Sequence, residues 1–397
     1  MTQPSPHALL AELRAALPVT VRCAYLQTGS LGPPSQPVLQ AIQEAEWLAA
    51  QEGPAAPAGL TPLVAASDGA RTALARLLNV PATELAWSLN TSTAMRTVVQ
   101  SLRLTGADRL ITSDQEHVAT RSLYNGLRDE VGLPVVVLST AGQPEDLLAR
   151  LEIALRQPTR GRNVVLLSHV SCIDGRRLPV TEAVALTRRG GGISLIDGAQ
   201  AVGQFPVDLR QLDADFYIGS GHKWLLGPSG IGYIHVHRDR LASFNPNWLP
   251  DADRPHATAA ALGEAGTTNL AQRAGLQVAV EQMLAIGLET AEAHCAQLAQ
   301  QLRAGLQALP GVTVLGPADP AQTTGLVGFT VQGWRAEEGK ALVERLYQEQ
   351  QILIKYQPEQ SGLRVSLAVF NTAEEVARLL AALESLCGHT SVDSQCR

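Results

Sequence analysis

One lysine of this chain lies in an unusual setting. Lys223 belongs to the stretch SGHKWLLGPSGIGY, in which apolar residues and glycines follow it directly. Upstream, Asp197 ends the apolar run ISLID, and the sequence ADFYIGSG between the two residues has the length of one strand. A carboxylate at the tip of a buried strand is costly without a cationic partner, although a lone aspartate there more often caps a helix or a turn. The spacing places both groups at the ends of neighbouring strands, on one rim of a sheet.

An amine and a carboxylate in this arrangement match the needs of pyridoxal 5'-phosphate (PLP). The lysine forms an imine with the cofactor's aldehyde and later carries the proton of the substrate Cα. The carboxylate keeps the ring nitrogen protonated, so that the ring can accept electrons. The sequence therefore predicts PLP as the cofactor, and predicts no metal, because neither an HExxH motif nor a cluster of Cys and His occurs.

A site for the cofactor's phosphate and a surface for its ring are also expected. Asn90, Thr91 and Ser92 follow one strand and open a helix, whose free N–H groups attract anions. A plain helix cap is the simpler interpretation of these three residues. Ser220 and His222 flank Lys223 and offer further donors, and His117, at the start of another helix, offers a ring that would stack on the cofactor, although a lone histidine is more often structural.

The elements that must position these residues alternate along the chain. Apolar runs at 85–90, 109–113, 134–139, 163–171, 193–200, 214–221 and 231–237 predict buried strands. Helical patterns at 92–104, 116–130, 144–156 and 180–190 lie between them. This order is typical of an α/β fold, with a mainly parallel seven-stranded sheet between layers of helices and a site at the carboxyl ends of the strands.

The composition changes near residue 250, and a smaller α+β domain is expected after it. We predict an N-terminal helical segment at 1–20 packing with the small domain, a large PLP-binding domain at 21–265, a small domain at 266–390 and a frayed tail at 391–397. The stretch EGPAAPAGL, at 52–60, is predicted to be flexible and in a place where a gating loop would sit.

Composition excludes several other classes of protein. The formal net charge is −6 and no basic stripe stands out, which argues against nucleic-acid binding. The first residues lack the features of a secretory signal, and no window is apolar enough for a membrane span. Five irregularly spaced cysteines indicate a reducing cytoplasm. The stretch GPSGIG is not a GxSxG nucleophile motif, since Ile231 occupies the last glycine position.

With these residues assembled, the chain resembles the class V aminotransferase group of fold-type I PLP enzymes. That group contains cysteine desulfurases, cystine C–S lyases and isopenicillin N epimerase-like proteins. The resemblance runs from AYLQTGSLGP (24–33) to FNTAEEVARLL (370–380), and its most specific motif is DGAQ followed by SGHKW.

The resemblance implies a role for each matching residue. Lys223 would be the Schiff-base lysine, Asp197 would pair with the pyridine nitrogen, Gln200 would hydrogen-bond the phenolic oxygen, and His117 would stack on the ring. The phosphate would be bound by Thr91, Ser92, Ser220 and His222, and by Thr267 of the neighbouring subunit in a homodimer. Arg364, in GLRVSLAVFNT, would clamp the substrate carboxylate.

The sequence departs from the desulfurases at two places. Cys172 replaces the asparagine of the family's SHVSN motif beside the cofactor, where it is either an inert small side chain or a reactive thiol. The stretch IKYQPEQSGLR carries no cysteine, whereas the desulfurases form a persulfide on a loop cysteine there.

The runs GHKWLLGPSGIGYIHVHRDRLASFNP and YLQTGSLGP look most like the cystine C–S lyase and epimerase-like branch, whose lyases work without the loop cysteine. We therefore expect a cytoplasmic homodimer that catalyses β-elimination at a C–S bond of a small amino acid. The alternatives are a class V aminotransferase, an epimerase and, more remotely, a binding module without catalytic activity.

Overall fold

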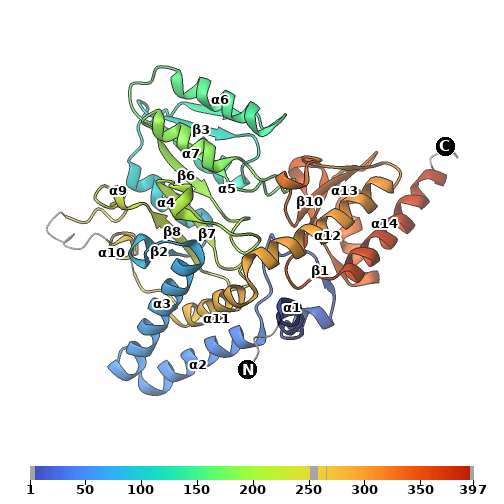
Figure 1. The fold of residues 1–397 in the computed structure, drawn as a ribbon, viewed down its shortest axis with the longest axis horizontal. Coiled ribbons are helices and arrows are strands. Elements are labelled where there is room, and N and C mark those ends of the chain that lie inside the picture. The colour runs from blue at the N-terminus through green and yellow to red at the C-terminus, as the bar shows by residue number, and fades with distance from the viewer. Residues whose placement is uncertain (1–4, 251–257, 265, 394–397) are drawn as a thin grey trace.

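The computed structural model describes residues 5–250, 258–264 and 266–393, and these form two main sheets with their covering helices, together with one two-stranded pairing (Figure 1). The larger sheet lies in the left part of this view and the smaller one lies to its right, near the C-terminus. The long helix α12 (Leu288–Ala308) runs between the two parts.

The larger sheet confirms the predicted mainly parallel, seven-stranded α/β fold. Its strand order is β2-β8-β7-β6-β5-β3-β4, and only β8 runs antiparallel to its neighbours. The strands are β2 (Leu85–Ser88), β3 (Arg109–Ser113), β4 (Val135–Leu138), β5 (Asn163–Ser168), β6 (Ile193–Asp197), β7 (Phe216–Ser220) and β8 (Gly232–Val236).

Helices bury both faces of this sheet, which explains why its strands are continuous apolar runs. On β5, Val165 and Leu167 point into one core, which includes side chains of α3 (Pro57–Leu78), α6 (Pro144–Arg156), α7 (Val180–Arg189) and α11 (Ala271–Ile286). Val164 and Leu166 point into the other core, beneath α4 (Thr91–Leu102) and α5 (Val118–Val131).

The smaller sheet is antiparallel and has its own core. Its order is β12-β13-β10-β9, from β9 (Val312–Val314), β10 (Leu326–Val331), β12 (Lys355–Gln357) and β13 (Gly362–Ser366). Apolar side chains of α12, α13 (Ala336–Gln350) and α14 (Ala373–Asp393) pack against it. A separate two-stranded pairing joins β1 (Ala24–Tyr25) to β11 (Ile352–Leu353).

The N-terminal part is more helical than the sequence suggested. Helix α1 (Pro6–Ala15) is tied to the C-terminal part, because Arg14 donates to the Phe370 carbonyl and to Glu375. Helix α2 (Gln36–Glu52) and α3 were not predicted, and both pack against α11. Short helices complete the chain at α8 (Leu209–Leu212), α9 (Arg238–Leu241) and α10 (Ala259–Gly263).

The predicted flexible stretch at 52–60 was wrong for most of its length. Glu52 ends α2 and Pro57 begins α3, so only residues 53–56 connect two helices. Proline at the first helical position starts a helix because its fixed φ suits the turn and its missing N–H is not needed there. This connection lies at the outer end of the α2–α3 pair (Figure 1).

The predicted domain boundaries stay predictions. Residues 391–393 of the predicted frayed tail belong to α14, and 394–397 lie outside the described residues. Within the part of the chain that the structure describes, no helix is both long and apolar enough to cross a membrane.

Candidate active site

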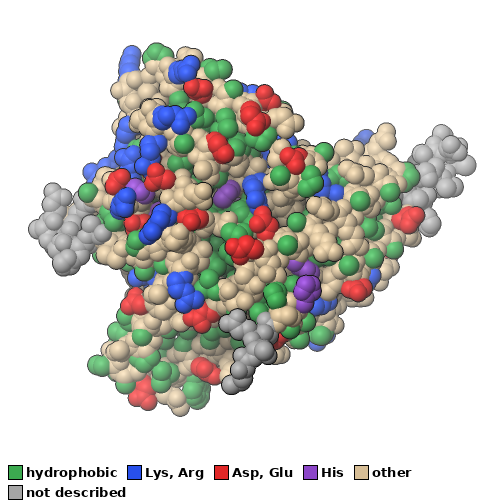
Figure 2. All heavy atoms as spheres, viewed as in Figure 1, with side chains coloured by type: hydrophobic (Ala, Val, Ile, Leu, Met, Phe, Trp, Pro, Cys, Tyr) green, Lys and Arg blue, Asp and Glu red, His purple; other side chains and the backbone are tan. Residues whose placement is uncertain are grey.

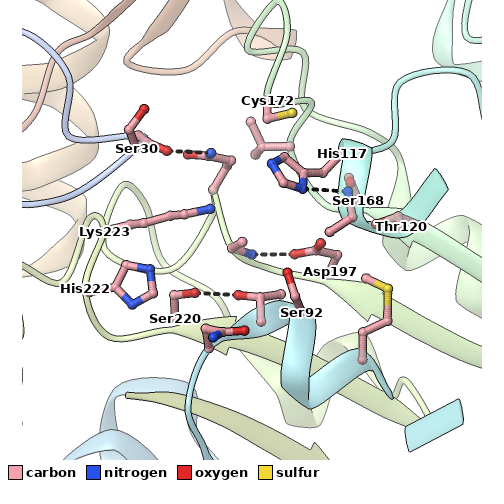
Figure 3. Close-up of a pocket in the computed structure, with 18 of the residues that line it drawn as sticks. Ser30, Ser92, His117, Thr120, Ser168, Cys172, Asp197, Ser220, His222 and Lys223 are labelled. Atoms are coloured by element: carbon pink, nitrogen blue, oxygen red, sulfur yellow. Dashed lines mark hydrogen bonds between the residues drawn. The ribbon is translucent and has the colours of Figure 1, made fainter. Parts of the chain in front are cut away.

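A cavity of about 430 Å³ lies where the larger sheet meets the smaller one. All the predicted site residues except Thr267 line it (Figure 3): Thr91, Ser92, His117, Cys172, Asp197, Gln200, Ser220, His222, Lys223 and Arg364. They come from the segments at the ends of strands β5, β6 and β7, from the starts of helices α4 and α5, and from strand β13. The sequence therefore placed these residues correctly in one pocket, whereas their individual roles remain predictions.

The amine and the carboxylate lie together as the strand spacing suggested. Asp197 is the last residue of β6, which pairs in parallel with β7, and Lys223 follows the end of β7. Asp197 is buried and its Oδ1 accepts the N–H of Ala199 at 2.9 Å. Burial raises the pKa of Asp197, and the nearby Lys223 opposes this rise. Burial lowers the pKa of the Lys223 amine, which increases the neutral, nucleophilic fraction of that amine.

Polar groups gather at the start of α4, on one side of Lys223. Asn90 is a true helix cap, since its Oδ1 accepts the N–H of Thr93 at 2.9 Å. Thr91 and Ser220 share a hydrogen bond between their hydroxyls at 2.5 Å. The Nδ1 atom of His222 is buried without a hydrogen-bond partner among the described residues. Helix N–H groups, hydroxyls and an unpartnered ring nitrogen together form a set of groups suited to an anion.

His117 is both a helix cap and a wall of the cavity. Its Nδ1 accepts the N–H of Ala119 at 3.1 Å, which fixes the ring at the start of α5. The preceding residue, Glu116, is fully buried and accepts hydrogen bonds from Ser113 and from the N–H and hydroxyl of Ser168. Burial, opposed by these hydrogen bonds, raises the pKa of Glu116 to about 7.

Arg364 forms the opposite end of the cavity. Its side chain is buried, and it donates from Nη1 to the Cys172 carbonyl at 2.9 Å and from Nη2 to the Ser30 hydroxyl at 2.8 Å. The Cys172 carbonyl also accepts from Gln357. Burial raises the pKa of the Cys172 thiol, while Arg364 and Lys223 lower it, so the thiol form is favoured. Figure 3 shows Ser30 and Cys172 on one side of Lys223, and Ser92 and Ser220 on the other.

Gln200 lines the cavity, whereas Thr267 does not. Gln200 donates to the Gly29 carbonyl at 2.9 Å and accepts from the Trp224 ring nitrogen at 2.7 Å, which leaves one N–H for a ligand. Thr267 lies in a different hollow, lined also by Trp87, Leu89 and Arg273. The predicted contact of Thr267 with a neighbouring subunit is therefore not tested in one chain.

Several lining residues escaped the sequence analysis. Lys355 lines the cavity from β12, and Gly29 and Ser30 line it from the segment after β1. Gly32 lies so close to the Lys223 backbone that a Cβ there would fall 2.0 Å from the Lys223 carbonyl oxygen. The rarity of lysine was a usable signal for Lys355, since the sequence contains only three lysines, at 223, 340 and 355.

The chemistry of these groups fits PLP. Lys223 would take the aldehyde and Asp197 the ring nitrogen. Thr91, Ser92, Ser220 and His222 would hold the phosphate, where the buried, unpartnered Nδ1 of His222 has room for an acceptor. The cavity volume also suits a cofactor of this size.

Comparisons with known proteins agree with this geometry. The family model described as aminotransferase class-V matches residues 34–379. An isopenicillin N epimerase of Streptomyces clavuligerus is 30% identical, covering 80% of this chain and 84% of that protein. A cysteine desulfurase of Pectobacterium atrosepticum is 29% identical, covering 81% and 82%. The structure of the cystine C–S lyase C-DES with its product cysteine persulfide superposes with a TM-score of 0.83 at 26% identity, covering 93% of this chain and 99% of that one.

Proposed function

The chain belongs to the class V aminotransferase family of PLP-dependent enzymes, and from that premise we propose that it catalyses β-elimination at a C–S bond of a small amino acid. The observation that carries the proposal is the arrangement of Lys223, Asp197 and Arg364 around one cavity whose β12–β13 connection has no cysteine. The same set provides an amine for the aldehyde, a carboxylate for the ring nitrogen and a guanidinium for the substrate carboxylate.

Bound PLP supplies an aldehyde that condenses with amino groups and a ring that withdraws electrons from the attached carbon. Asp197 holds the ring nitrogen in its protonated form. Arg364 binds the α-carboxylate with its planar guanidinium and so orients the bond that breaks at Cα. With its amine free of the cofactor, Lys223 would accept the Cα proton. The Cβ–S bond would then break, and the sulfur would leave with the bonding electrons, as a thiolate or, from cystine, as a persulfide. Hydrolysis of the remaining three-carbon fragment would give pyruvate and ammonia.

The missing loop cysteine argues against a sulfur relay through a persulfide. The connection between β12 and β13 consists of the short turn Pro358–Gln360 and Ser361, and no residue from 351 to 371 is a cysteine. Cys172 is the cysteine at the cavity, and burial raises its pKa, which disfavours the thiolate that such a relay requires. Elimination needs no protein thiol.

Epimerisation is the second candidate, because the relative from Streptomyces clavuligerus is named isopenicillin N epimerase. It would use Lys223, Asp197 and Arg364 in the same way up to proton removal, and it differs in returning a proton to Cα. Transamination differs in returning the proton to the cofactor. Product analysis separates the three reactions.

The first test is an absorbance spectrum of the purified protein before and after addition of L-cystine or L-cysteine, with pyruvate measured in the same sample. We expect the visible band of lysine-bound cofactor, its loss in Lys223→Ala and its retention in Lys340→Ala, since Lys340 is exposed on α13. Pyruvate should accumulate in the native protein and in Lys340→Ala.

The outcomes separate the parts of the proposal. A spectral change on adding the amino acid without pyruvate would reject elimination. Loss of optical rotation would then identify epimerisation, and a keto acid formed only with an acceptor would identify transamination. A native protein that shows no band after incubation with PLP would reject the assigned site.

A further inference from the structure

A second cation stands beside Arg364 at the substrate end of the cavity. Lys355 and Arg364 are directly opposite each other in the antiparallel pair of β12 and β13, and both line the cavity. Opposed residues of such a pair project from the same face, with Cβ atoms about 5 Å apart. The two charged ends therefore reach the same space from neighbouring strands.

The use of lysine at this position stands out against the rest of the chain. Of 31 basic residues only three are lysines, and two of them, Lys223 and Lys355, line this cavity. The third, Lys340, lies exposed on α13. The positive charge of this protein is thus carried almost entirely by arginine, so Lys355 is not explained as one more solubilising cation.

The charges at this end of the cavity are complementary to an anion. Arg364 and Lys355 both act on Lys223 as like charges, which places the three cations within electrostatic reach of one another. The anion site at the start of α4 lies on the other side of Lys223, where Ser92 and Ser220 are seen in Figure 3. Lys355 therefore belongs with the substrate clamp rather than with the expected phosphate site.

Resting on the proposed function, we propose that Lys355 and Arg364 form a two-cation subsite that selects α-amino acids with a second anionic group on the side chain. Arg364 takes the α-carboxylate, and Lys355 takes a carboxylate or similar anion a few bonds further along. The amine of Lys355 is a compact point charge on a flexible stem, so it can follow anions at slightly different distances.

The test uses dicarboxylates that lack an amine and therefore cannot react. Succinate and glutarate are each compared with their monoamides, which match them in size and lack one charge. Dissociation constants are measured by calorimetry on the PLP-loaded enzyme. We expect each dicarboxylate to bind at least about tenfold more tightly than its monoamide, the effect of one charge-assisted hydrogen bond.

Variants assign that preference to Lys355. The measured quantity is the ratio of the dissociation constant of the monoamide to that of the dicarboxylate. In Lys355→Gln this ratio should fall to near one, whereas Lys355→Arg should keep most of the native ratio and Lys340→Gln should leave it unchanged. A ratio near one in the native enzyme, a ratio that survives Lys355→Gln, or no binding of either dicarboxylate at millimolar concentration would overturn the subsite. Because binding is measured without turnover, an enzyme that does not catalyse elimination would still give these dissociation constants. Absence of the cofactor band would show separately that the proposed function had failed.

Discussion

At the level of single residues, two buried carboxyl groups that interact with each other have raised pKa values at this site. Asp197 ends β6, and Glu116 follows β3 and is bound by the hydroxyls of Ser113 and Ser168. Burial is the largest cause of the raised pKa of both carboxyl groups. The charge of Asp197 raises the pKa of Glu116 further. Asp197 has a cationic neighbour in Lys223, whereas hydrogen bonds from Ser113 and Ser168 oppose the rise in the pKa of Glu116. We infer that Glu116 holds its proton so that Asp197 can remain ionised.

Glu116→Gln should remove a pH-dependent loss of stability. The folded pKa of about 7 lies above the unfolded value of about 4.3. Between these values the folded state binds the extra proton, so the free energy of unfolding falls as the pH rises through this window. Glutamine does not titrate, so this loss of stability with rising pH is absent in Glu116→Gln. The stability of Glu116→Gln relative to the native protein should therefore rise from pH 5 to pH 8, by on the order of 3 kcal/mol.

Urea unfolding of the PLP-loaded proteins at pH 5, 6, 7 and 8 measures this difference directly. Titrating groups that do not interact with Glu116 are common to both proteins and cancel, whereas Asp197, which does interact with it, contributes to the measured difference. A stability difference that is flat with pH, or that falls as the pH rises, would contradict a protonated Glu116 in the folded state.

At the level of elements, the sequence predicted strands better than it predicted contacts between distant segments. The seven central strands are apolar runs long enough to stand out locally, and most of the predicted site residues follow their ends, whereas Arg364 lies in β13 of the smaller sheet. Helix α2 was missed because its apolar face is dilute, with Val38, Ile42 and Ala49 as its buried residues. Helix α3 was missed although it buries a denser apolar face that includes Leu63, Leu74 and Leu78. Lys355 and Ser30 enter the cavity only because β12 and the segment after β1 fold against it, which no local pattern encodes.

The segment after β1 packs against the backbone that follows β7 and carries Lys223, and Gly32 lies at this contact. The Gly32 N–H donates to the His222 carbonyl at 2.7 Å, and a Cβ would lie 2.0 Å from the Lys223 carbonyl oxygen. Gly32→Ala must push the two backbones apart, which overpacking data put at a cost of about 1–3 kcal/mol. We expect reduced stability together with weaker retention of PLP.

A matched glycine controls for the substitution itself. Gly126 lies in α5, and a Cβ there meets no atom within 4 Å. Gly126→Ala should stabilise the helix by up to about 1 kcal/mol and leave the dissociation constant of PLP unchanged. Thermal unfolding and PLP titration of both variants test the contrast, and equal effects from the two substitutions would show that Gly32 has no special role.

At the level of the whole molecule, the surface gives a reason to propose a second subunit. The face in Figure 2 mixes acidic, basic and apolar side chains. Large apolar side chains stay exposed at Leu39 and Trp47 on α2 and at Leu89 before α4. Leu89 borders a hollow of about 870 Å³ that also contains Thr267, and Leu39 borders a smaller one that shares Ser229 and Gln272 with it. We propose that a second copy covers this surface and that Thr267 reaches the phosphate in that copy's cavity.

Hybrid dimers distinguish a contribution of Thr267 to its own cavity from one to the partner's. Lys223→Ala and Thr267→Ala chains with different tags are coexpressed, and the mixed dimer is isolated through both tags. If Thr267 acts across the interface, one cavity of the hybrid combines native Lys223 with native Thr267, while the other carries both substitutions. If Thr267 acts within its own chain, every cavity with Lys223 lacks Thr267.

The two arrangements predict different cofactor affinities. We expect the Thr267→Ala homodimer to bind PLP about tenfold more weakly, the loss of one hydrogen bond to a charged group. The hybrid should then retain native PLP affinity and about half the native activity, because only one of its two cavities is complete. Weak PLP binding in the hybrid would place Thr267 in its own cavity. Native PLP affinity in the Thr267→Ala homodimer would show that Thr267 does not bind the phosphate in either cavity. Failure of the two chains to form a mixed dimer would likewise contradict a contact of Thr267 across a subunit interface.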